Sequence, residues 1–440
     1  MSKRISVIGT GYVGLVTGTG LADFGNKVIC VDVDKAKIDM LNHGQIPIYE
    51  PGLKELVDKN VREGRLSFTS KIDRALKEAE VVFIGVGTPS KENGEADLSY
   101  VEAVVESIGK NLDGYKVIVT KSTVPVGTNR WIKQAIIEES GKDTFDIVSN
   151  PEFLREGSAV HDVFHPDRVV IGYETERARE IIQDIYKALY MIETPFLFCN
   201  LETAELIKYA SNAFLATKIT FINQIANLCE AVGADVHKVA KGMGMDGRIS
   251  PKFLHPGPGY GRSCFPKDTK ALVDIGNKNN VDMSLVKEVV SSNEKQKARM
   301  VLKLESLFEG KLRDKQIGIL GLAFKAETDD MRESPSIIII EELLNRGANI
   351  VGHDPQAMEN AKTIFGDSIE YADSEYKAIN NCDAIMILTE WNQYRGLDLE
   401  MVKRLMKGNI ILDTRNLIDP ERARELGFRC EGVGKRMFMK

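Results

Sequence analysis

The chain has 440 residues, with 58 basic and 64 acidic side chains and a formal net charge of −6. Its length exceeds one ordinary core, so two or three domains are expected. Hydrophobic residues make up 43% and charged residues 28%, a balance that excludes extensive disorder. The acidic balance argues against nucleic-acid binding, and no apolar run approaches the ~18 residues that a membrane span needs.

The first 35 residues predict a strand, a glycine-rich turn, a helix and a second strand. An apolar run over residues 5–8 precedes the pattern G-x-G-x-x-G, made of Gly9, Gly11 and Gly14. A helix over 15–24 and a strand over 28–31 follow, and Asp32 comes 21 residues after Gly11. Such glycines let the backbone approach a pyrophosphate, and the acid would accept hydrogen bonds from ribose hydroxyls and repel a 2′-phosphate. The pattern predicts an NAD site; the alternative is a glycine-rich turn that binds no nucleotide.

Further strands are predicted over residues 81–86, 116–121 and 146–149, with helical stretches between them. This alternation predicts a parallel, doubly wound sheet. Two of these strands end in polar loops that contain Thr88 and Thr123. Ligands gather at the carboxyl ends of strands in such sheets, so both threonines are candidates for cofactor binding, although turn formation explains either one equally well.

Residues 203–232 predict one long helix, because apolar residues recur at helical spacing without a proline or glycine. Thirty residues would span about 45 Å. We expect this helix to join two domains and its surplus apolar surface to pair with a second subunit.

The last third of the chain weakly repeats the opening pattern. Residues 315–321 resemble the first strand and turn, and residues 347–354 resemble residues 25–32. The glycine fingerprint is missing, a loop spans 323–332, Ser334 and Pro335 predict a helix start, and strands are predicted at 384–388 and 410–412. The predicted fold class is α/β, with two Rossmann-like doubly wound domains joined by a long central helix. The expected domains are residues 1–200, 201–300 and 313–440.

Three polar pairs have i, i+4 spacing, so each would point to one side if it lay on a helix. They are Glu152 with Glu156, Lys208 with Asn212, and Cys264 with Asp268. A single such pair is more often a surface or capping feature than a catalytic one, but the middle pair interrupts the apolar pattern of an otherwise buried helix.

Cys264 is the strongest candidate nucleophile. It follows a glycine-rich loop over 257–263, and Pro266 begins a helix just after it. A cysteine at a helix N-terminus beside Lys267 is expected to have a lowered pKa, and a thiolate can attack an aldehyde and later leave from a thioester. The alternative is an inert buried thiol, our interpretation of the other five cysteines. No CxxC pair is present, so we expect no metal and a cytoplasmic protein. His161 and His165, before Pro166, are interpreted as loop residues.

The chain resembles the UDP-glucose dehydrogenase family of nucleotide-sugar dehydrogenases from end to end. The matching segments are residues 9–32, 49–53, 122–128, 150–157, 263–268 and 321–325. The resemblance implies an N-terminal NAD domain, a long central helix and a C-terminal nucleotide-sugar domain. The apolar helix over 203–232 and Arg248 together predict a homodimer or a larger homo-oligomer. It also implies oxidation of the C6 alcohol of UDP-glucose to UDP-glucuronate with two NAD.

The resemblance further implies residue roles. Cys264 would form a thiohemiacetal and then a thioester, Lys208 and Asn212 would stabilise the oxyanion, and Asp268 would help to activate water. Thr123 and Glu156 would belong to the surrounding network, and Glu152 would do acid–base work or position the substrate. Further cofactor positions would be Thr88, Lys267 and Arg332. Further substrate positions would be Phe153, Leu154, Arg248 from a neighbouring subunit, Tyr260, Gly261, Lys325 and Arg415.

Arg262 stands where the family usually has glycine, and an arginine there is expected to exclude a positive φ or to fill space beside the sugar. Dehydrogenases for GDP-mannose or UDP-N-acetylhexosamine are the first alternative, although Phe265 favours the UDP-glucose branch. A second alternative is a nucleotide-sugar-binding protein without turnover, which would be expected to lack the cysteine, lysine or aspartate. A third is a simple hydroxyacid dehydrogenase, which would not need Cys264.

Overall fold

The computed structural model describes residues 2–91 and 93–435. The chain forms two compact α/β units. The first holds the chain up to Ser211 together with Asp274–Asn280, and the second holds Asn212–Val273 and the chain from Val281 onward. The helix α9 (Leu201–Val232), 32 residues long, joins the two Rossmann-like units, as the sequence predicts.

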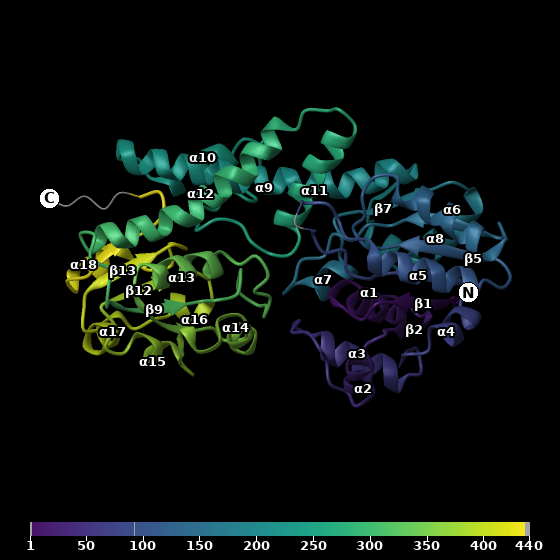
Figure 1. Ribbon diagram of the computed structural model, residues 1–440, viewed down its shortest axis with the longest axis horizontal. Coiled ribbons are helices and arrows are strands. Elements are labelled where there is room, and N and C mark those ends of the chain that lie inside the picture. The colour runs from purple at the N-terminus through teal and green to yellow at the C-terminus, as the bar shows by residue number, and fades with distance from the viewer. Residues whose placement is uncertain (1, 92, 436–440) are drawn as a thin grey trace. The chain divides into compact units, whose positions relative to one another are not determined.

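The first unit contains an eight-stranded sheet in the order β3-β2-β1-β4-β5-β6-β7-β8. Its strands β1, β2, β5 and β7 are labelled in Figure 1. The strands are β1 (Arg4–Ile8), β2 (Lys27–Val31), β3 (Leu66–Thr69), β4 (Val81–Ile84), β5 (Lys116–Thr120), β6 (Phe145–Ser149), β7 (Val169–Tyr173) and β8 (Phe196–Cys199). The predicted parallel sheet is confirmed for β1 to β6. It is wrong at one edge, because β7 runs antiparallel to β6 and β8 runs parallel to β7. The chain order reverses between β1 and β4, which is where ligands bind in such sheets.

Alternate residues of each central strand face two different hydrophobic cores. In β4, Val81 and Phe83 belong to one core, whereas Val82 and Ile84 belong to the other, and all four are fully buried. This burial on both faces explains why the strands read as continuous apolar runs in the sequence.

The helices of the first unit cover both faces of this sheet. They are α1 (Tyr12–Asp23), α2 (Lys35–Asn42), α3 (Leu53–Arg62), α4 (Ile72–Glu78), α5 (Ser99–Lys110), α6 (Thr128–Ser140), α7 (Ala159–Phe164), α8 (Glu176–Ile185) and the 3-10 turn η1 (Lys187–Ile192). The interpretation of His161 as a loop residue is wrong, because α7 begins at Ala159 and ends before Pro166 can interrupt it.

The second unit contains a six-stranded parallel sheet in the order β11-β10-β9-β12-β13-β14. Its strands β9, β12 and β13 are labelled in Figure 1. The strands are β9 (Gln316–Leu320), β10 (Asn349–His353), β11 (Glu370–Tyr371), β12 (Ala384–Ile387), β13 (Ile410–Asp413) and β14 (Arg429–Glu431). The predicted second Rossmann-like domain is therefore confirmed.

The remaining helices lie in the centre and at the end of the chain. They are α10 (Val236–Gly244), α11 (Phe265–Lys278), α12 (Ser284–Leu307), α13 (Pro335–Asn345), α14 (Met358–Phe365), η2 (Gly366–Ser368), α15 (Glu375–Ile379), α16 (Asn392–Arg395), α17 (Leu399–Leu405) and α18 (Pro420–Glu425). Ser334 caps α13 by accepting from the Ser336 N–H, and Pro335 opens the helix as predicted. Over the described residues, no helix combines the length and apolar character needed to cross a membrane.

Candidate active site

The glycine fingerprint turns from β1 into α1 at the carboxyl end of the first sheet. Gly9 has φ +104°, and a Cβ on it would lie 2.6 Å from the Gly85 carbonyl oxygen; a Cβ on Gly14 would collide with the Gly9 carbonyl. Both glycines therefore serve the close packing of helix and strands. Gly11, which precedes α1, has no atom within 4 Å of its Cβ position. Because that position opens onto the N–H end of a helix, the turn fits the pyrophosphate of a dinucleotide.

Asp32 lies beside this turn, at the end of β2. Its carboxylate accepts hydrogen bonds from the Thr10 N–H at 2.8 Å, the Thr10 hydroxyl at 2.7 Å and the Asp34 N–H at 3.0 Å. Burial raises the pKa of Asp32, but the hydrogen bonds from Asp34 and Thr10 outweigh burial and lower the pKa below its ordinary value. The negative charge is thus fixed where an adenosine ribose would lie in this fold, and it disfavours a 2′-phosphate.

The two threonines at strand ends are brought together. The Thr88 hydroxyl donates to the Thr123 carbonyl oxygen at 2.8 Å, and the Ser122 hydroxyl donates to the Val86 carbonyl oxygen at 2.6 Å. The loops that follow β4 and β5 are therefore tied to each other at the carboxyl edge of the sheet.

Glu152 and Glu156 would share one face only if they lay on a helix, and the structure places them in an irregular loop after β6. Both are nevertheless buried, with 4% and 3% of their surfaces exposed. The Glu152 carboxylate pairs with the Lys208 ammonium of α9 at 2.9 Å and also accepts from the Leu154 N–H. This charge pair is buried on both sides, so removing either partner would strand the other in a low-dielectric site. The Phe153 ring lies under the Arg168 guanidinium at 3.6 Å and 5.3 Å from the Lys208 ammonium.

A second buried lysine stands at the end of β5 and was missed in the sequence. The Lys121 ammonium donates to Asn150 Oδ1 at 3.1 Å and to the Tyr186 hydroxyl oxygen at 3.4 Å. Burial lowers its pKa from 10.5 to about 8, and the Lys208 charge adds to the lowering while Glu152 opposes it. Its place in the sequence, directly after an apolar strand and before Ser122, was the signal that could have indicated a buried lysine.

The predicted nucleophile lies in the second unit, directly before α11. The Asp268 N–H donates to the Cys264 carbonyl oxygen at 2.7 Å, which confirms Cys264 at the start of the helix. The Asp268 carboxylate is fully buried, accepts from the Asn212 amide at 2.5 Å and pairs with the Lys267 ammonium at 2.8 Å. Lys208 and Asn212 are one turn apart on α9, as predicted.

The other five cysteines lie in surroundings that disfavour ionisation of the thiol. Burial raises the pKa of each of these thiols, which suppresses the reactive thiolate. They are Cys30, Cys199, Cys229, Cys382 and Cys430. Cys264 and Cys199 are both half-buried.

The loop before Cys264 overturns one expectation. Arg262 adopts φ +77°, so an arginine at this position does not exclude the left-handed conformation. Gly261 is the position that requires glycine for space, because a Cβ there would collide with the Glu333 carbonyl and approach Pro335 Cδ at 2.9 Å. A left-handed non-glycine residue is strained, and this strain lies two residues before the nucleophile.

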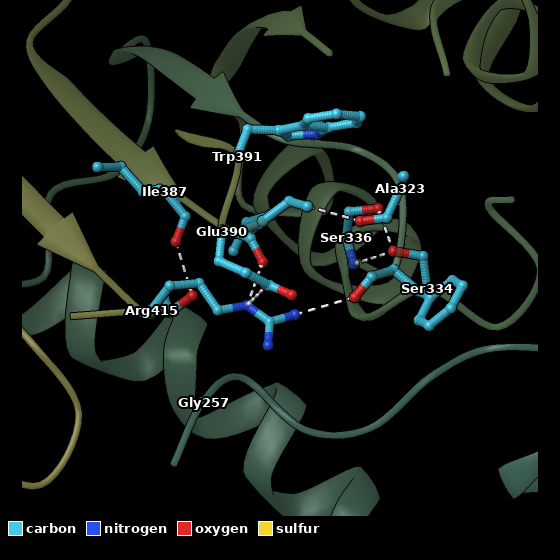
Figure 2. Close-up of polar contacts among 12 residues, drawn as sticks. Gly257, Ala323, Ser334, Ser336, Ile387, Glu390, Trp391 and Arg415 are labelled. Atoms are coloured by element: carbon cyan, nitrogen blue, oxygen red, sulfur yellow. Dashed lines mark hydrogen bonds and ion pairs between the residues drawn. The ribbon is translucent and has the colours of Figure 1, made fainter. Parts of the chain in front are cut away.

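Arg415 ties together the carboxyl edge of the second sheet. Its Nε donates to the Leu388 carbonyl oxygen at 2.8 Å and lies 3.2 Å from the Glu390 carboxylate, while Nη2 donates to the Phe324 carbonyl oxygen at 3.0 Å. Figure 2 shows the guanidinium between Glu390 and the segment that holds Gly257, whose Cβ position is 3.3 Å from Nη1. Arg415 thereby links the ends of β9 and β12 to the glycine-rich loop.

The internal repeat is visible in the carboxylate that follows β10. Asp354 accepts from the Leu322 and Ala323 N–H groups at 2.8 and 3.0 Å and from the Trp391 indole at 3.2 Å. It occupies the place that Asp32 holds in the first sheet, but an indole fills its surroundings. This difference agrees with a second domain altered for another ligand.

The remaining predicted residues are more exposed. The Arg332 guanidinium pairs with Asp330 at 2.8 Å, and the Lys325 ammonium lies 5.9 Å from the Phe324 ring centre. The Arg248 side chain is 90% exposed and pairs with Asp246 at 2.6 Å. Within the described part of its own unit, Arg248 is not brought to the other predicted residues.

Three models of one family match the chain in succession. They are the NAD binding domain, the central domain and the UDP binding domain of the UDP-glucose/GDP-mannose dehydrogenase family, at residues 3–190, 202–295 and 318–420. A UDP-glucose 6-dehydrogenase of Rhizobium meliloti (strain 1021) is 49% identical over 435 residues, which cover 98% of this chain and 99% of that protein.

Two solved structures are similar over nearly the whole chain. A UDP-glucose dehydrogenase from Pyrobaculum islandicum has a TM-score of 0.93 at 40% identity, with 99% of this chain and 98% of that one covered. A UDP-D-ManNAc dehydrogenase from Pyrococcus horikoshii has a TM-score of 0.87 at 26% identity, with 98% and 99% covered.

Proposed function

Because the chain belongs to the UDP-glucose/GDP-mannose dehydrogenase family, we propose that it oxidises the C6 alcohol of UDP-glucose to the carboxylate with NAD. One observation carries the proposal. Cys264 stands at the N-terminus of α11 beside the Asp268–Asn212 pair, in a chain whose first sheet carries a dinucleotide fingerprint and a ribose-side aspartate. A hydroxyacid dehydrogenase or a binding protein without turnover would need no such cysteine.

NAD would lie over the first sheet. When bound, NAD accepts one hydride in each of the two oxidations. The open approach at Gly11 and the N–H end of α1 would receive the pyrophosphate, and Asp32 would receive the ribose hydroxyls. Thr88 and Thr123 would line the same strand ends, and Glu156, Lys267 and Arg332 are further cofactor candidates by resemblance.

Cys264 would carry the sugar between the two oxidations. Its thiolate adds to the C6 aldehyde, and the oxyanion that forms on the sugar oxygen is stabilised by the Lys208 ammonium and the Asn212 amide. The second oxidation turns this thiohemiacetal into a thioester. Asp268 takes a proton from a water that attacks the thioester carbonyl, the carbon–sulfur bond breaks, and the thiolate returns to Cys264.

Glu152 and the uridine side complete the assignment. Glu152 holds the Lys208 ammonium and would act in positioning or proton transfer, with Phe153 and Leu154 in the same loop. Lys325 and Arg415 would hold the nucleotide, with Tyr260 and Gly261 of the glycine-rich loop beside the sugar. Arg415 already lies against that loop at Gly257, which supports its place there.

We further propose a homodimer formed through α9. Large apolar side chains remain exposed along one side of this helix, at intervals of four, seven or eight residues, and Phe214 is 65% exposed. They are Leu206, Phe214, Phe221, Leu228 and Val232. A stripe of this kind is typical of a helix that packs against another helix. Arg248, an exposed side chain that pairs with the nearby Asp246, would serve the sugar site of the neighbouring subunit.

Residues 1–200 would form the NAD-binding domain, and residues 201–300 would form the domain for dimerisation and catalysis. Residues 313–440 would form the domain that binds the nucleotide sugar. A cytoplasmic location is supported by all six cysteines, which are free thiols.

Two variants test the covalent mechanism. Cys264→Ser supplies a less acidic nucleophile and a poorer leaving group, so turnover is expected to collapse while NAD binding, followed by fluorescence titration, is retained. Asp268→Asn is expected to stall after both oxidations, with a burst approaching two NADH per active site and an added sugar mass on Cys264. Near wild-type turnover of Cys264→Ser would refute the mechanism.

A further inference from the structure

Side-chain amides from two helices hold the backbone of the loop that leads to Cys264. The Gly257 N–H donates to Asn223 Oδ1 of α9 at 2.8 Å, and the Gly257 carbonyl oxygen accepts from the Gln296 amide of α12 at 2.9 Å. The Tyr260 N–H donates to Asn293 Oδ1 of α12 at 2.7 Å, and its carbonyl oxygen accepts from Asn293 Nδ2 at 3.0 Å. We call Asn223, Asn293 and Gln296 the amide clamp.

The amide clamp replaces the pairing that a β-sheet would provide. Residues 257–260 form no helix or strand, yet all four are buried. Buried backbone groups need partners, and the clamp supplies them for both the N–H and the C=O of Gly257 and Tyr260. The clamp residues are themselves buried, with at most 3% of their surfaces exposed.

The fit between clamp and loop is close enough to require glycine. Gly259 lies between the two clamped residues with φ +117°, and a Cβ on it would be 3.0 Å from Asn293 Oδ1 and 3.2 Å from Lys297 Cγ. This conformation is accessible to glycine and rarely to other residues. The clamp therefore fixes the backbone path of the loop.

A short series of contacts connects the clamped loop to the nucleophile. The Tyr260 ring packs edge-on against the Phe265 ring at 6.1 Å and belongs to a small core with Ala216 and Val289. Phe265 is the first residue of α11 and directly follows Cys264. On the other side of the loop, Gly257 faces the Arg415 guanidinium.

We propose that Asn223, Asn293 and Gln296 are positioning residues for the reaction, which hold Cys264 at the N-terminus of α11. The proposal rests on the proposed function, in which Cys264 is the nucleophile. The clamp acts through the backbone of Gly257 and Tyr260 and touches no reacting atom. A misplacement of about 1 Å can cost about 100-fold in rate, so the amides matter although they lie behind the loop.

The test compares Asn293→Ala with Gln224→Ala in the full-length protein. Gln224 donates from α9 to the Ser292 hydroxyl of α12 at 3.1 Å, so its loss removes an amide contact between the same helices without touching the loop. The rate of Cys264 alkylation by iodoacetamide is followed by peptide mass spectrometry between pH 6 and 10, without substrate. The raised pKa of the other five thiols keeps them slow.

Asn293→Ala is expected to move the midpoint of the alkylation profile upward by at least half a pH unit, because a thiol released from a helix N-terminus loses stabilisation of its thiolate. In the same variant kcat is expected to fall at least 10-fold, whereas Gln224→Ala stays within twofold of wild type in both measurements.

An unchanged midpoint with kcat within twofold in Asn293→Ala would overturn the proposal, as would an equal loss in Gln224→Ala. If Asn293→Ala does not fold, Gln296→Met takes its place under the same criteria; it removes the donor to the Gly257 carbonyl and the oxygen that accepts from the Asn227 amide. Because alkylation needs no substrate, a wild-type protein that failed to oxidise UDP-glucose would refute the proposed function, while the alkylation midpoint of Asn293→Ala would still test the placement of Cys264.

Discussion

Replacing Lys121 by methionine should change the pH dependence of stability in the first unit. Methionine keeps the length and apolar character of the side chain and removes its charge. Asn150 Oδ1 keeps a partner, since it also accepts from the Tyr186 hydroxyl at 2.7 Å. The variant therefore removes a buried ammonium without leaving an unpaired polar atom on Asn150.

The size of the effect follows from the lowered pKa of Lys121. Burial lowers this pKa from 10.5 to about 8, so between these values the unfolded chain binds more protons than the folded one. Wild-type stability should therefore rise with pH through this window, and below pH 8 the protonated lysine should destabilise the fold in full. The whole shift corresponds to about 3 kcal/mol, of which about 2 kcal/mol falls between pH 7 and 9.5.

Urea unfolding at pH 7 and 9.5, followed by fluorescence, measures this difference. The chain has two tryptophans, and Trp131 in α6 reports the first unit once Trp391 is replaced by phenylalanine in every protein compared. The stability of Lys121→Met relative to wild type should fall by about 2 kcal/mol from pH 7 to 9.5. The exposed-lysine variant Lys142→Met controls for loss of a lysine in general. A difference between Lys121→Met and wild type that did not change with pH would refute the reasoning.

Four further outcomes are expected. The kcat/KM with NAD should exceed that with NADP at least 100-fold, and Asp32→Ser should reduce this NAD preference. An NAD preference in Asp32→Ser equal to that of the wild type in steady-state assays would contradict the assignment of Asp32. Arg262→Gly should raise the thermal midpoint, with a gain of up to about 1 kcal/mol from relieved left-handed strain, and a lower midpoint would show that the arginine's contacts outweigh the strain. Glu152→Gln should destabilise the fold by about 3 kcal/mol in urea titrations, because the Lys208 charge is left buried, and adding Lys208→Met should restore stability but not turnover. Phe221→Glu should give a monomer in light scattering at micromolar concentration, whereas an unchanged mass would exclude α9 from the interface.

The sequence predicts the fold well where local patterns decide it. Runs such as Val81–Ile84 are buried on both faces, so their apolar character reads directly as a parallel strand. The long helix and the start of α13 at Pro335 carry equally local signals. The direction of β7 has no such signal, because strand pairing depends on contacts between distant segments.

The site shows the same division. The glycine fingerprint and Cys264 are motifs along the chain, and they lie where the sequence predicts. The i, i+4 spacing of Glu152 and Glu156 could not distinguish a helix from a loop, and the loop is held by long-range partners such as Lys208. Lys121 and the amide clamp escaped prediction for a related reason. Their partners lie 29 to 65 positions away along the chain, and only the folded backbone brings them together.

The most direct test of the central claim is the stoichiometry of NADH released per nucleotide sugar consumed. The purified protein is given NAD with limiting UDP-glucose, GDP-mannose or a UDP-N-acetylhexosamine, and NADH absorbance is compared with product identified by mass spectrometry. The account predicts two NADH and one UDP-glucuronate per UDP-glucose, with kcat/KM highest for this sugar and no turnover by Cys264→Ser. One NADH per sugar with release of an aldehyde, or a higher kcat/KM for another nucleotide sugar, would contradict it.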